Sequence, residues 1–442
     1  MSLETINGWG LTTPAITDLK KIDTNEIGKL FNFEKTVIAR GLGRSYGDAA
    51  QNSGGTTYLT EDLVYCDLNS GILDADAGIS IEYILKKYVP LGWFVPVTPG
   101  TKFVTLGGAV AADIHGKNHH KVGTIGLHLV SFEICTPIGD FICSPIENSD
   151  LFWATIGGMG LTGVIKRVKI KMLKIESSAI SVSTFRLKNL EQTMIKMIEL
   201  DKNFDYSVAW LDTLSTAEKL GRSVITAGNH ATNDDLSKEY INENLKYEVA
   251  QKFKTPKNIP NGLLNKHSVG IFNKFWFYKS SKRRENEIQT INKFFYPLDV
   301  VKDWNRIYGD QGFVQYQVVL PDSKESLIEE ILNTFSKLKC PIFLAVLKRM
   351  GEQNKGLLSF PLKGWTLALD IPSGFPELNL ILDSIDKKII QAGGRIYLAK
   401  DSRLNPKELE LMYPNIVEFR KIRDKFDPNK KIRSDLSRRL SL

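Results

Sequence analysis

Two glycine-rich segments contain the residues of this chain that could bind a ligand through the backbone. The first is Arg40-Gly-Leu-Gly-Arg-Ser-Tyr-Gly-Asp48, and the second runs from Pro99-Gly100 through Gly107-Gly108 to Asp113-Ile-His-Gly-Lys-Asn118. Glycine has no Cβ and adopts positive φ at little cost, so such loops let backbone N–H groups approach a phosphate closely. Together the two segments predict a cradle for a pyrophosphate, and hence a dinucleotide cofactor.

The glycine spacing narrows the choice of cofactor. Neither segment follows the G-x-G-x-x-G fingerprint of a Rossmann unit or the G-x-x-x-x-G-K-[ST] of a P-loop. A flavin dinucleotide is the remaining candidate. Ordinary turn formation is the alternative for any single loop, but a third loop follows in order, Gly157-Gly-Met-Gly-Leu-Thr-Gly163.

A metal site is the competing interpretation of the histidines in the second segment. His115 and His119 lie four residues apart, a spacing that two metal ligands have on one helical face. Gly116 disfavours a helix there, and no carboxylate or thiol cluster accompanies the pair. We therefore expect no metal site.

The three loops resemble the FAD-binding domain of the vanillyl-alcohol-oxidase-type flavoproteins. Within that superfamily the chain is most similar to the polyprenylphosphoryl-ribose 2'-oxidases, through Gly41-Leu-Gly-Arg-Ser-Tyr-Gly-Asp48, Asp113-Ile-His-Gly-Lys-Asn-His-His120, Gly312-Phe-Val-Gln-Tyr-Gln317 and Ala399-Lys-Asp-Ser-Arg403. The resemblance runs nearly end to end. It implies an α+β fold with a vanillyl-alcohol-oxidase-type (PCMH-type) FAD-binding domain and a substrate domain. It also implies FAD-dependent oxidation of the 2'-hydroxyl of a polyprenylphosphoryl-β-D-ribose, the first half of an epimerisation to arabinose.

Two positions depart from relatives in ways that affect the chemistry. Many members of the superfamily have a histidine between the second glycine and the serine of the first loop, and it bonds covalently to the flavin. This chain has Arg44, so we expect non-covalent FAD. Mycobacterial members have a cysteine where this chain has Ala368. Catalysis should survive that change, whereas covalent inhibitors aimed at the cysteine should fail.

By the same resemblance, the cofactor contacts come from the three loops and one residue near the C-terminus. They are Ala39, Arg40, Gly41, Leu42, Gly43, Arg44, Ser45, Tyr46, Gly47, Asp48, Gly100, Thr105, Leu106, Gly107, Gly108, Ala112, Asp113, Ile114, His115, Gly163, Val164, Ile165 and Tyr397.

Oxidising a secondary alcohol requires a hydride acceptor and a destination for the hydroxyl proton. The resemblance places the catalytic residues Lys400, Tyr46 and His115 at the flavin. A lysine there could hold the hydroxyl, stabilise developing negative charge or, with its pKa lowered by burial, accept the proton. These three roles stay open. The implied substrate-binding residues combine lysines, which suit a phosphate, with glutamines, which suit sugar hydroxyls: Lys117, Trp210, Gln315, Gln317, Lys348 and Lys400.

Composition restricts the class of protein. A chain of 442 residues with 42% hydrophobic and 24% charged residues is typical of a globular protein of two domains. No run approaches eighteen apolar residues, and the amino terminus lacks the pattern of a signal peptide. We expect a cytoplasmic protein. Its four cysteines show no C-x-x-C spacing and should be reduced.

The net charge of +8 is unevenly distributed. Nine basic residues and no acidic one lie between Gln251 and Arg284. Such a mixture of basic and apolar groups suits peripheral binding to an anionic membrane, here the inner face of the plasma membrane. The alternative is a core segment with a solvated rim of lysines. Nucleic acid is not expected, because no recognition module surrounds the segment. The interleaved apolar residues are Ile259, Leu263, Leu264, Ile271, Phe272, Phe275, Trp276 and Phe277.

The elements that position the loops can be predicted from periodicity. A helix is expected over 80–89, because apolar residues recur there at i, i+3, i+4 and i+7. Alternation predicts a strand at 130–134, a turn at 136–140, an antiparallel strand at 141–143 and a further strand at 168–172.

The glycine loops stop near residue 178, so residues 1–178 are expected to form the FAD-binding domain. Residues 179–394 should form the substrate domain, an antiparallel sheet covered by helices on one side. Its predicted parts are strands at 313–320, 342–347 and 365–371, a helix opened by a capping box of Asp322 and Glu325, and a helix over 376–392 ending at Gly393. In the resembled family residues 395–442 return to complete the FAD-binding domain, which fits a helix opened by Asn405-Pro406.

Two other functions remain open. A soluble sugar or aldonolactone oxidase of the same fold would not need the basic apolar segment. A non-catalytic flavin-fold binding protein would not need Lys400 together with intact loops. If the chain is the ribose oxidase, a short-chain reductase partner would complete the epimerisation.

Overall fold

Two small sheets hold the glycine-rich loops. The computed structural model describes residues 3–21, 24–32, 35–60, 65–248 and 253–442. One sheet has the order β1 (Leu3–Ile6), β2 (Ala15–Lys20), β4 (Thr56–Leu59) and β3 (Val37–Arg40). The other is antiparallel, in the order β5 (Cys66–Asn69), β6 (Ile72–Asp76), β10 (Val164–Lys171), β8 (Leu129–Thr136) and β9 (Gly139–Cys143).

The elements predicted in this half are confirmed. Helix α1 (Ile81–Tyr88) begins after the N-cap Ser80 and buries all four of its periodic apolar residues. β8 and β9 pair around the predicted turn, and Val168 and Ile170 of β10 are buried while Lys169 and Lys171 are exposed. Three short helices lie next to the second and third loops: α2 (Leu106–Ala111) within the second loop, α3 (His119–Val122) directly after it, and α4 (Ser149–Thr155) just before the third loop.

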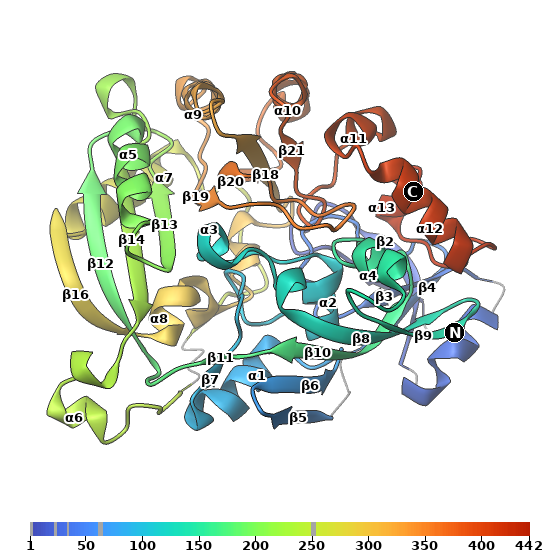
Figure 1. Cartoon of the computed structure of the whole chain (residues 1–442). Helices are drawn as coiled ribbons and strands as arrows, with labels where there is room; N and C mark the ends of the chain where they lie inside the picture. Colours follow the sequence, from blue (N-terminus) through green and yellow to red (C-terminus); the bar gives the residue numbers. More distant parts are fainter. Residues whose placement is uncertain (1–2, 22–23, 33–34, 61–64, 249–252) are drawn as a thin grey trace.

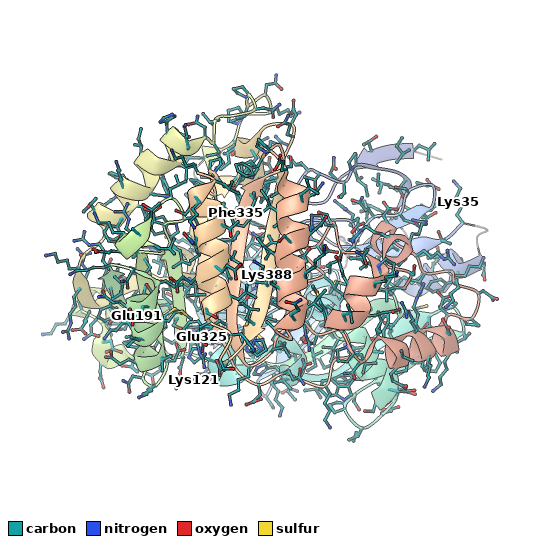
Figure 2. All side chains as sticks on the ribbon, turned by 90° about the horizontal axis from the view of Figure 1, so that it is seen from above. Lys35, Lys121, Glu191, Glu325, Phe335 and Lys388 are labelled. Carbon is teal, nitrogen blue, oxygen red and sulfur yellow. The ribbon has the colours of Figure 1, made fainter. Side chains whose placement is uncertain are left out.

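An eight-stranded antiparallel sheet forms the other half (Figure 1). Its order is β16 (Arg283–Thr290), β12 (Ala179–Leu187), β14 (Ser223–His230), β13 (Tyr206–Leu211), β19 (Ala345–Met350), β20 (Gly364–Pro372), β18 (Phe313–Pro321) and β21 (Arg395–Ile396). Helices α5 (Leu190–Leu200), α9 (Ser326–Lys337) and α10 (Leu378–Gln391) cover one face. Figure 2 views that face, with Glu191, Phe335 and Lys388 marking the three helices. The predicted sheet covered on one side is therefore confirmed.

Alternation along β18 separates the two faces of this sheet. The hydroxyl of Tyr316 donates to Asp386 of α10 on the covered face. Its neighbours Gln315 and Gln317 point the other way, toward the glycine loops. The open face of the sheet is therefore available to form a binding site.

Two details of this half differ from expectation. Asp322 does not cap α9, because its carboxylate bonds to Arg349, and the N-cap Glu325 makes no side-chain cap bond. β19 begins at Ala345 and not at 342, although Ile342 is buried. The apolar residues from 342 onward are buried or half-buried, but strand pairing begins only at Ala345.

The C-terminal segment packs against the first half. Helices α12 (Ile416–Phe426) and α13 (Asp435–Arg439) lie near β2, β3 and β4 in Figure 1, and α11 (Pro406–Met412) lies beside α10. Asn405 opens α11 with a capping box, as predicted. Ile432 bridges in parallel to Val37, and Arg439 pairs with Asp48 of the first loop.

The remaining elements connect those already described. They are β7 (Trp93–Phe94), β11 (Leu173–Lys174), α6 (Lys238–Ile241), β15 (Phe253–Lys254), α7 (Lys266–Lys279), α8 (Ile291–Phe295), β17 (Val301–Lys302), and 3-10 helices at 24–32, 89–91, 125–128, 217–219, 233–235, 297–300 and 304–308. Gln251 and Lys252 of the predicted basic segment lie outside the described residues. All four cysteines are buried and free. Within the described ranges no helix has the length and apolarity to cross a bilayer.

Candidate active site

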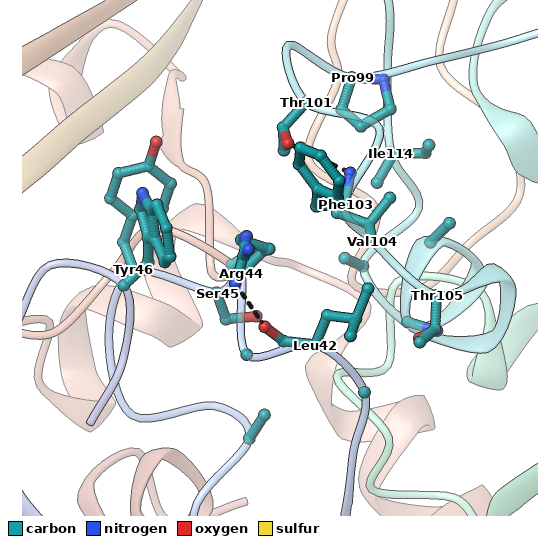
Figure 3. Close-up of a pocket in the computed structure, with 18 of the residues that line it drawn as sticks. Leu42, Arg44, Ser45, Tyr46, Pro99, Thr101, Phe103, Val104, Thr105 and Ile114 are labelled. Carbon is teal, nitrogen blue, oxygen red and sulfur yellow. Dashed lines mark hydrogen bonds between the residues drawn. The ribbon is translucent and has the colours of Figure 1, made fainter. Parts of the chain in front are cut away.

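A cavity of about 500 Å³ lies between the glycine loops and the open face of the large sheet. One side, which we call the loop wall, consists of lining residues from 39–46, 99–115 and 159–165. The other, the sheet wall, consists of Gln315, Gln317, Leu344, Val346, Lys348 and Ala368. Residues 298–304 form the rim. Figure 3 shows Leu42 to Tyr46 facing Pro99 to Thr105 across the loop wall.

The two glycine segments touch at Gly41 and Thr105. A Cβ on Gly41 would lie 2.2 Å from the Thr105 hydroxyl oxygen, which accepts the Gly108 N–H as the cap of α2. Gly43 has φ +63, in the left-handed region that favours glycine. These requirements explain why glycine occupies both positions, and they bring the two loops into one wall.

The loop wall fits a dinucleotide. No hydrogen bond within the described chain uses the N–H groups of Leu42, Gly43 or Ser45. A Cβ on Gly100 would meet no atom within 4 Å, so a side chain there would enter the cavity. Unused backbone donors and a glycine-lined approach are what a pyrophosphate needs.

Arg44 occupies the position that links the flavin in many relatives. Its guanidinium lies 4.0 Å from the centre of the Trp9 ring and donates to the Leu42 carbonyl at 2.7 Å. Among the described lining residues His115 is the one histidine, and none is a cysteine. Non-covalent binding stays a prediction, supported by this lack of a linking group at Arg44.

His115 is oriented by the turn that precedes it. Asp113 has φ +42, and its carboxylate accepts hydrogen bonds from Gly126, Asn354 and Ser359. Across the cavity, the Gln317 amide nitrogen lies 2.9 Å from His115 Nε2. Burial lowers the pKa of His115 well below its usual value, so the ring is neutral and Nε2 accepts this bond. The proton then resides on Nδ1, which is buried and has no partner in the described chain. That donor fits a polar group of a cofactor or substrate.

The register of the sheet aligns the sheet wall. Gln317, Ala368, Val346 and Trp210 are successive partners across β18, β20, β19 and β13. Gln315 lies opposite Asp370 and donates to its Oδ1 at 2.5 Å. Because partners in register point to the same face, residues far apart in sequence form one surface.

Lys400 lies where the two walls meet. The Tyr397 N–H donates to Gln317 and the Tyr46 N–H donates to Ala399, so the short segment 397–400 is tied to both walls. Lys400 Nζ is 3.6 Å from the centre of the Tyr46 ring. Burial lowers the pKa of Lys400 to about 7, and Asp370 opposes that effect. The amine therefore changes protonation state near neutral pH.

Three half-buried lysines with desolvated amines lie near this end of the cavity. Burial lowers the pKa of Lys348 to about 8, and burial together with Lys348 lowers that of Lys117 to about 7. Lys348 also disfavours the charged form of Lys400. A nearby carboxyl group is that of Asp370, whose pKa burial raises to about 7 and whose Oδ2 has no hydrogen-bond partner among the described residues. An anionic ligand beside Lys117 and Lys348 would stabilise the charged form of both lysines.

Most of the predicted site residues line this cavity. They are Ala39, Gly41, Leu42, Gly43, Arg44, Ser45, Tyr46, Gly100, Thr105, Gly107, Gly108, Ala112, Ile114, His115, Gly163, Ile165, Gln315, Gln317, Lys348, Tyr397 and Lys400. Ala368 lines it too.

The remaining predicted residues lie behind the lining. The cofactor candidates among them are Arg40, Gly47, Asp48, Leu106, Asp113 and Val164, and the substrate candidates are Lys117 and Trp210. Arg40 donates to the Asn7 and Ala50 carbonyls, and Asp48 pairs with Arg439, so both fix the first loop. Lys117 donates to the Phe294 carbonyl.

The sequence reasoning missed Trp9, Asp370 and the rim. Trp9 stacks on Arg44 and lies between Gly8 and Gly10, where a Cβ would come within 2.3 Å and 2.5 Å of backbone oxygens. A Gly-Trp-Gly sequence was therefore an available signal. Asp370 and rim residues such as Trp304 carry no local pattern that distinguishes them.

Comparison with known proteins agrees with this geometry. Residues 25–144 match the family model described as an FAD binding domain. Decaprenylphosphoryl-beta-D-ribose oxidase of Mycolicibacterium smegmatis is 37% identical over 98% of this chain and 97% of that protein. An uncharacterized protein in the mprA 5' region of Streptomyces coelicolor is 31% identical over 82% of this chain and all of that protein. Cytokinin dehydrogenase 9 of rice is 32% identical over 39% of this chain and 34% of its own length.

These matches agree with the resemblance found in the glycine loops and in the Ala399-Lys-Asp-Ser-Arg403 segment. The alignment with the Mycolicibacterium protein extends over nearly the whole of both chains, so it includes the residues of the loop wall and of the sheet wall. The chain is an FAD-dependent oxidoreductase with a PCMH-type FAD-binding domain, and it belongs to the flavoprotein family of decaprenylphosphoryl-β-D-ribose oxidase.

Proposed function

We propose that this enzyme oxidises the 2'-hydroxyl of a polyprenylphosphoryl-β-D-ribose to the 2'-keto sugar. The observation that carries the proposal is the lysine cluster of Lys117, Lys348 and Lys400 beside the cavity. Desolvation disfavours the charged form of these amines, and a phosphate attached to the sugar would offset that cost at Lys117 and Lys348. The Mycolicibacterium relative supports the choice of a lipid-linked ribose, because its name states that activity.

The residues of this chain divide the remaining work. Bound FAD supplies the hydride acceptor. Lys400, in its neutral form, accepts the proton of the substrate hydroxyl, since its pKa of about 7 makes that form available at neutral pH. Tyr46 confines the amine from one side at 3.6 Å, and the Nδ1 proton of His115 donates toward the reacting groups.

Substrate orientation comes from the sheet wall and from the residues behind it. Lys348, with Lys117, holds the phosphate as a point charge. Gln315 and Gln317 bond to sugar hydroxyls, and their bonds to Asp370 and His115 fix their side chains. Trp210, one strand beyond Val346, lies next to the sheet wall and would contact the far end of the substrate.

The setting of the reaction follows from the substrate. A polyprenyl tail partitions into a bilayer, so the enzyme works in the cytoplasm as a peripheral protein at the inner face of the plasma membrane. A keto sugar must be reduced to complete the epimerisation, and a short-chain reductase partner performs that step. We assign the FAD-binding domain to 1–178 and 395–442, and the substrate domain to 179–394.

The test is anaerobic reduction of the bound flavin. Purified holoenzyme should bleach when mixed with a polyprenylphosphoryl-β-D-ribose, and should stay yellow with free ribose or an aldonolactone. Bleaching by the water-soluble sugars alone would instead support a soluble sugar oxidase. Acid precipitation should release the flavin into the supernatant, and flavin retained in the pellet would contradict non-covalent binding.

A further inference from the structure

Helix α7 (Lys266–Lys279) exposes apolar side chains and buries a polar one. Its outer stripe is Ile271, Phe275 and Tyr278, which are 71%, 58% and 63% exposed. These residues are spaced by four and three positions, so they share one face. Its inner stripe is Val269, Asn273 and Phe277, all buried. A surface helix of a globular protein usually has polar residues on its outer face, so the apolar outer stripe of α7 is unusual.

Specific contacts hold α7 in this orientation. The buried Asn273 amide donates to Asp212 Oδ1 at 2.7 Å, and Asp212 also pairs with the buried Arg222 at 2.7 Å. On its flank, Phe272 packs against Phe343 with ring centres 4.9 Å apart. Rotating the apolar stripe inward would break a buried charged network, so the outward orientation is built into the fold.

Positive charge flanks the stripe. Lys274 and Lys279 lie on either side of it, and Lys266 begins the helix. All three are exposed and form no ion pair within the described residues. No acidic residue occurs from 253 to 284. Arg283 and Arg284, by contrast, pair with Glu285 and Glu287, so they add little net charge.

The same surface reaches the rim of the cavity. β15 (Phe253–Lys254) pairs with β17 (Val301–Lys302), whose residues line the rim. Leu264 packs against the cluster of Trp304, Tyr308 and Phe313, which includes the rim residue Trp304, and α7 begins two residues later. Phe253 and Leu263 are 65% and 49% exposed. An apolar, basic surface therefore extends outward from the rim of the cavity.

We propose that this α7 surface docks on an anionic membrane. We define it as Phe253, Leu263, Ile271, Phe275 and Tyr278 with Lys266, Lys274 and Lys279. The proposal rests on the proposed function, because a lipid tail that leaves the cavity at the rim then enters the bilayer directly. Apolar side chains insert at the boundary of headgroups and acyl chains, and lysines attract anionic lipid.

Charge distinguishes a membrane from the other possible occupants. In a symmetric dimer through this face, each lysine would approach the lysines of the second copy, with no acidic residue on the surface to offset the repulsion. Nucleic acid would engage the lysines and leave the apolar stripe exposed. An anionic bilayer matches both parts of the surface.

The experiment is vesicle sedimentation of full-length holoenzyme. We expect binding to phosphatidylglycerol vesicles and at least about fivefold weaker binding to phosphatidylcholine vesicles. The triple variant Ile271→Asn, Phe275→Asn, Tyr278→Asn and the triple variant Lys266→Gln, Lys274→Gln, Lys279→Gln should each lose at least about tenfold in binding to anionic vesicles. Flavin content should not change in either variant.

Matched controls remove the same groups elsewhere. Ile195→Asn, Ile198→Asn, Leu380→Asn alters exposed apolar residues on α5 and α10, and Lys337→Gln, Lys339→Gln, Lys387→Gln removes the same charge from exposed positions. Both controls should bind vesicles like the wild type. Equal binding to both lipids, equal losses in the controls, or a dimer that only the apolar α7 variant abolishes would overturn the proposal.

Activity separates this proposal from the proposed function. On long-chain polyprenylphosphoryl ribose in anionic vesicles, both α7 variants should reduce flavin several-fold more slowly than the wild type. With a short-chain, water-soluble phosphoryl ribose, they should equal it. If no phosphoryl ribose reduces the flavin of any variant, the proposed function fails, and vesicle binding still decides the docking surface. If the variants lose vesicle binding but match the wild type on the vesicle substrate, the link between docking and substrate entry is wrong.

Discussion

The loop wall and the sheet wall face the same cavity but are built by different means. The loop wall acts through backbone groups, and its residues are neighbours in sequence, such as Leu42, Gly43 and Ser45. The sheet wall acts through side chains from β18, β19 and β20, brought together by register. The first kind of wall suits a cofactor common to a superfamily, and the second kind can change substrate by substituting side chains. The comparison predicts that mutations on the two walls have separable effects.

Lys400→Ala should have the largest effect on chemistry. Loss of the proton acceptor should slow anaerobic flavin reduction by about a hundredfold or more, because acid–base groups typically contribute that much. FAD content should stay normal, since the loop wall is intact. Lys302→Ala, which removes the same charge at the rim, is the control and should reduce flavin at close to the wild-type rate. Normal reduction in Lys400→Ala would exclude the lysine from the mechanism.

Gly41→Ala should weaken FAD binding, whereas Lys400→Ala slows the reaction and leaves FAD binding intact. The new Cβ would lie 2.2 Å from the Thr105 hydroxyl, which is fixed as the cap of α2, so the two loops must separate. We expect FAD affinity to fall by about tenfold, equivalent to 1.4 kcal/mol. The flavin-to-protein ratio after gel filtration measures this. Gly28→Ala, at an exposed position where a Cβ would make only an ordinary contact of 3.9 Å with Cys135 Sγ, should retain full flavin. Full occupancy in Gly41→Ala would show that the contact is not required.

Asp370→Asn should shift the pH dependence and leave FAD in place. The Asp370 anion raises the pKa of Lys400, so its removal lowers that pKa below its present value of about 7. If neutral Lys400 is the proton acceptor, the acid limb of the flavin-reduction profile should move to lower pH by about one unit. A shift of the alkaline limb instead would mean that Lys400 acts as a cation.

Asp386→Asn is the contrasting variant for this test. Asp386 is a buried carboxylate on the covered face of the same sheet, bonded to Tyr316 and Arg403. Its loss should lower thermal stability and leave the limbs of the pH profile unmoved. The same limb shift in both variants would indicate a general disturbance of the sheet and not a specific interaction with Lys400.

Ala368→Cys should have the smallest effect on catalysis. Ala368 lines the cavity, and the substitution adds one sulfur atom to the sheet wall. We expect flavin reduction within about twofold of the wild type, because small volume changes are tolerated. The variant should gain one site for a cavity-directed thiol reagent by intact mass. The native wild type should gain none, since its four cysteines are buried. Labelling of the wild type at equal rate would contradict this.

Much of the fold was accessible from the sequence. The periodicity of α1, the hairpin of β8 and β9, the long strands β18 and β20 and the end of α10 before Gly393 were all predicted correctly. Local interactions specify these elements. The predicted capping box at Asp322 was wrong, because a partner distant in sequence, Arg349, bonds to its carboxylate. Local sequence signals do not reveal hydrogen-bond partners that are distant in sequence.

The candidate site divides in the same way. The sequence by itself determined the loop wall and the choice of a flavin, because a phosphate cradle needs glycine at fixed local spacing and the backbone supplies the contacts. Only the tertiary structure decided which side chains complete the cavity. Strand register places Asp370 opposite Gln315, and the segment 397–400, which is tied to both walls, places Lys400 against Tyr46. No sequence pattern predicts either contact. Tertiary structure also decided which face of α7 points outward. The buried hydrogen bond from Asn273 to Asp212 directs the apolar stripe to the surface, whereas an amphipathic helix would bury it.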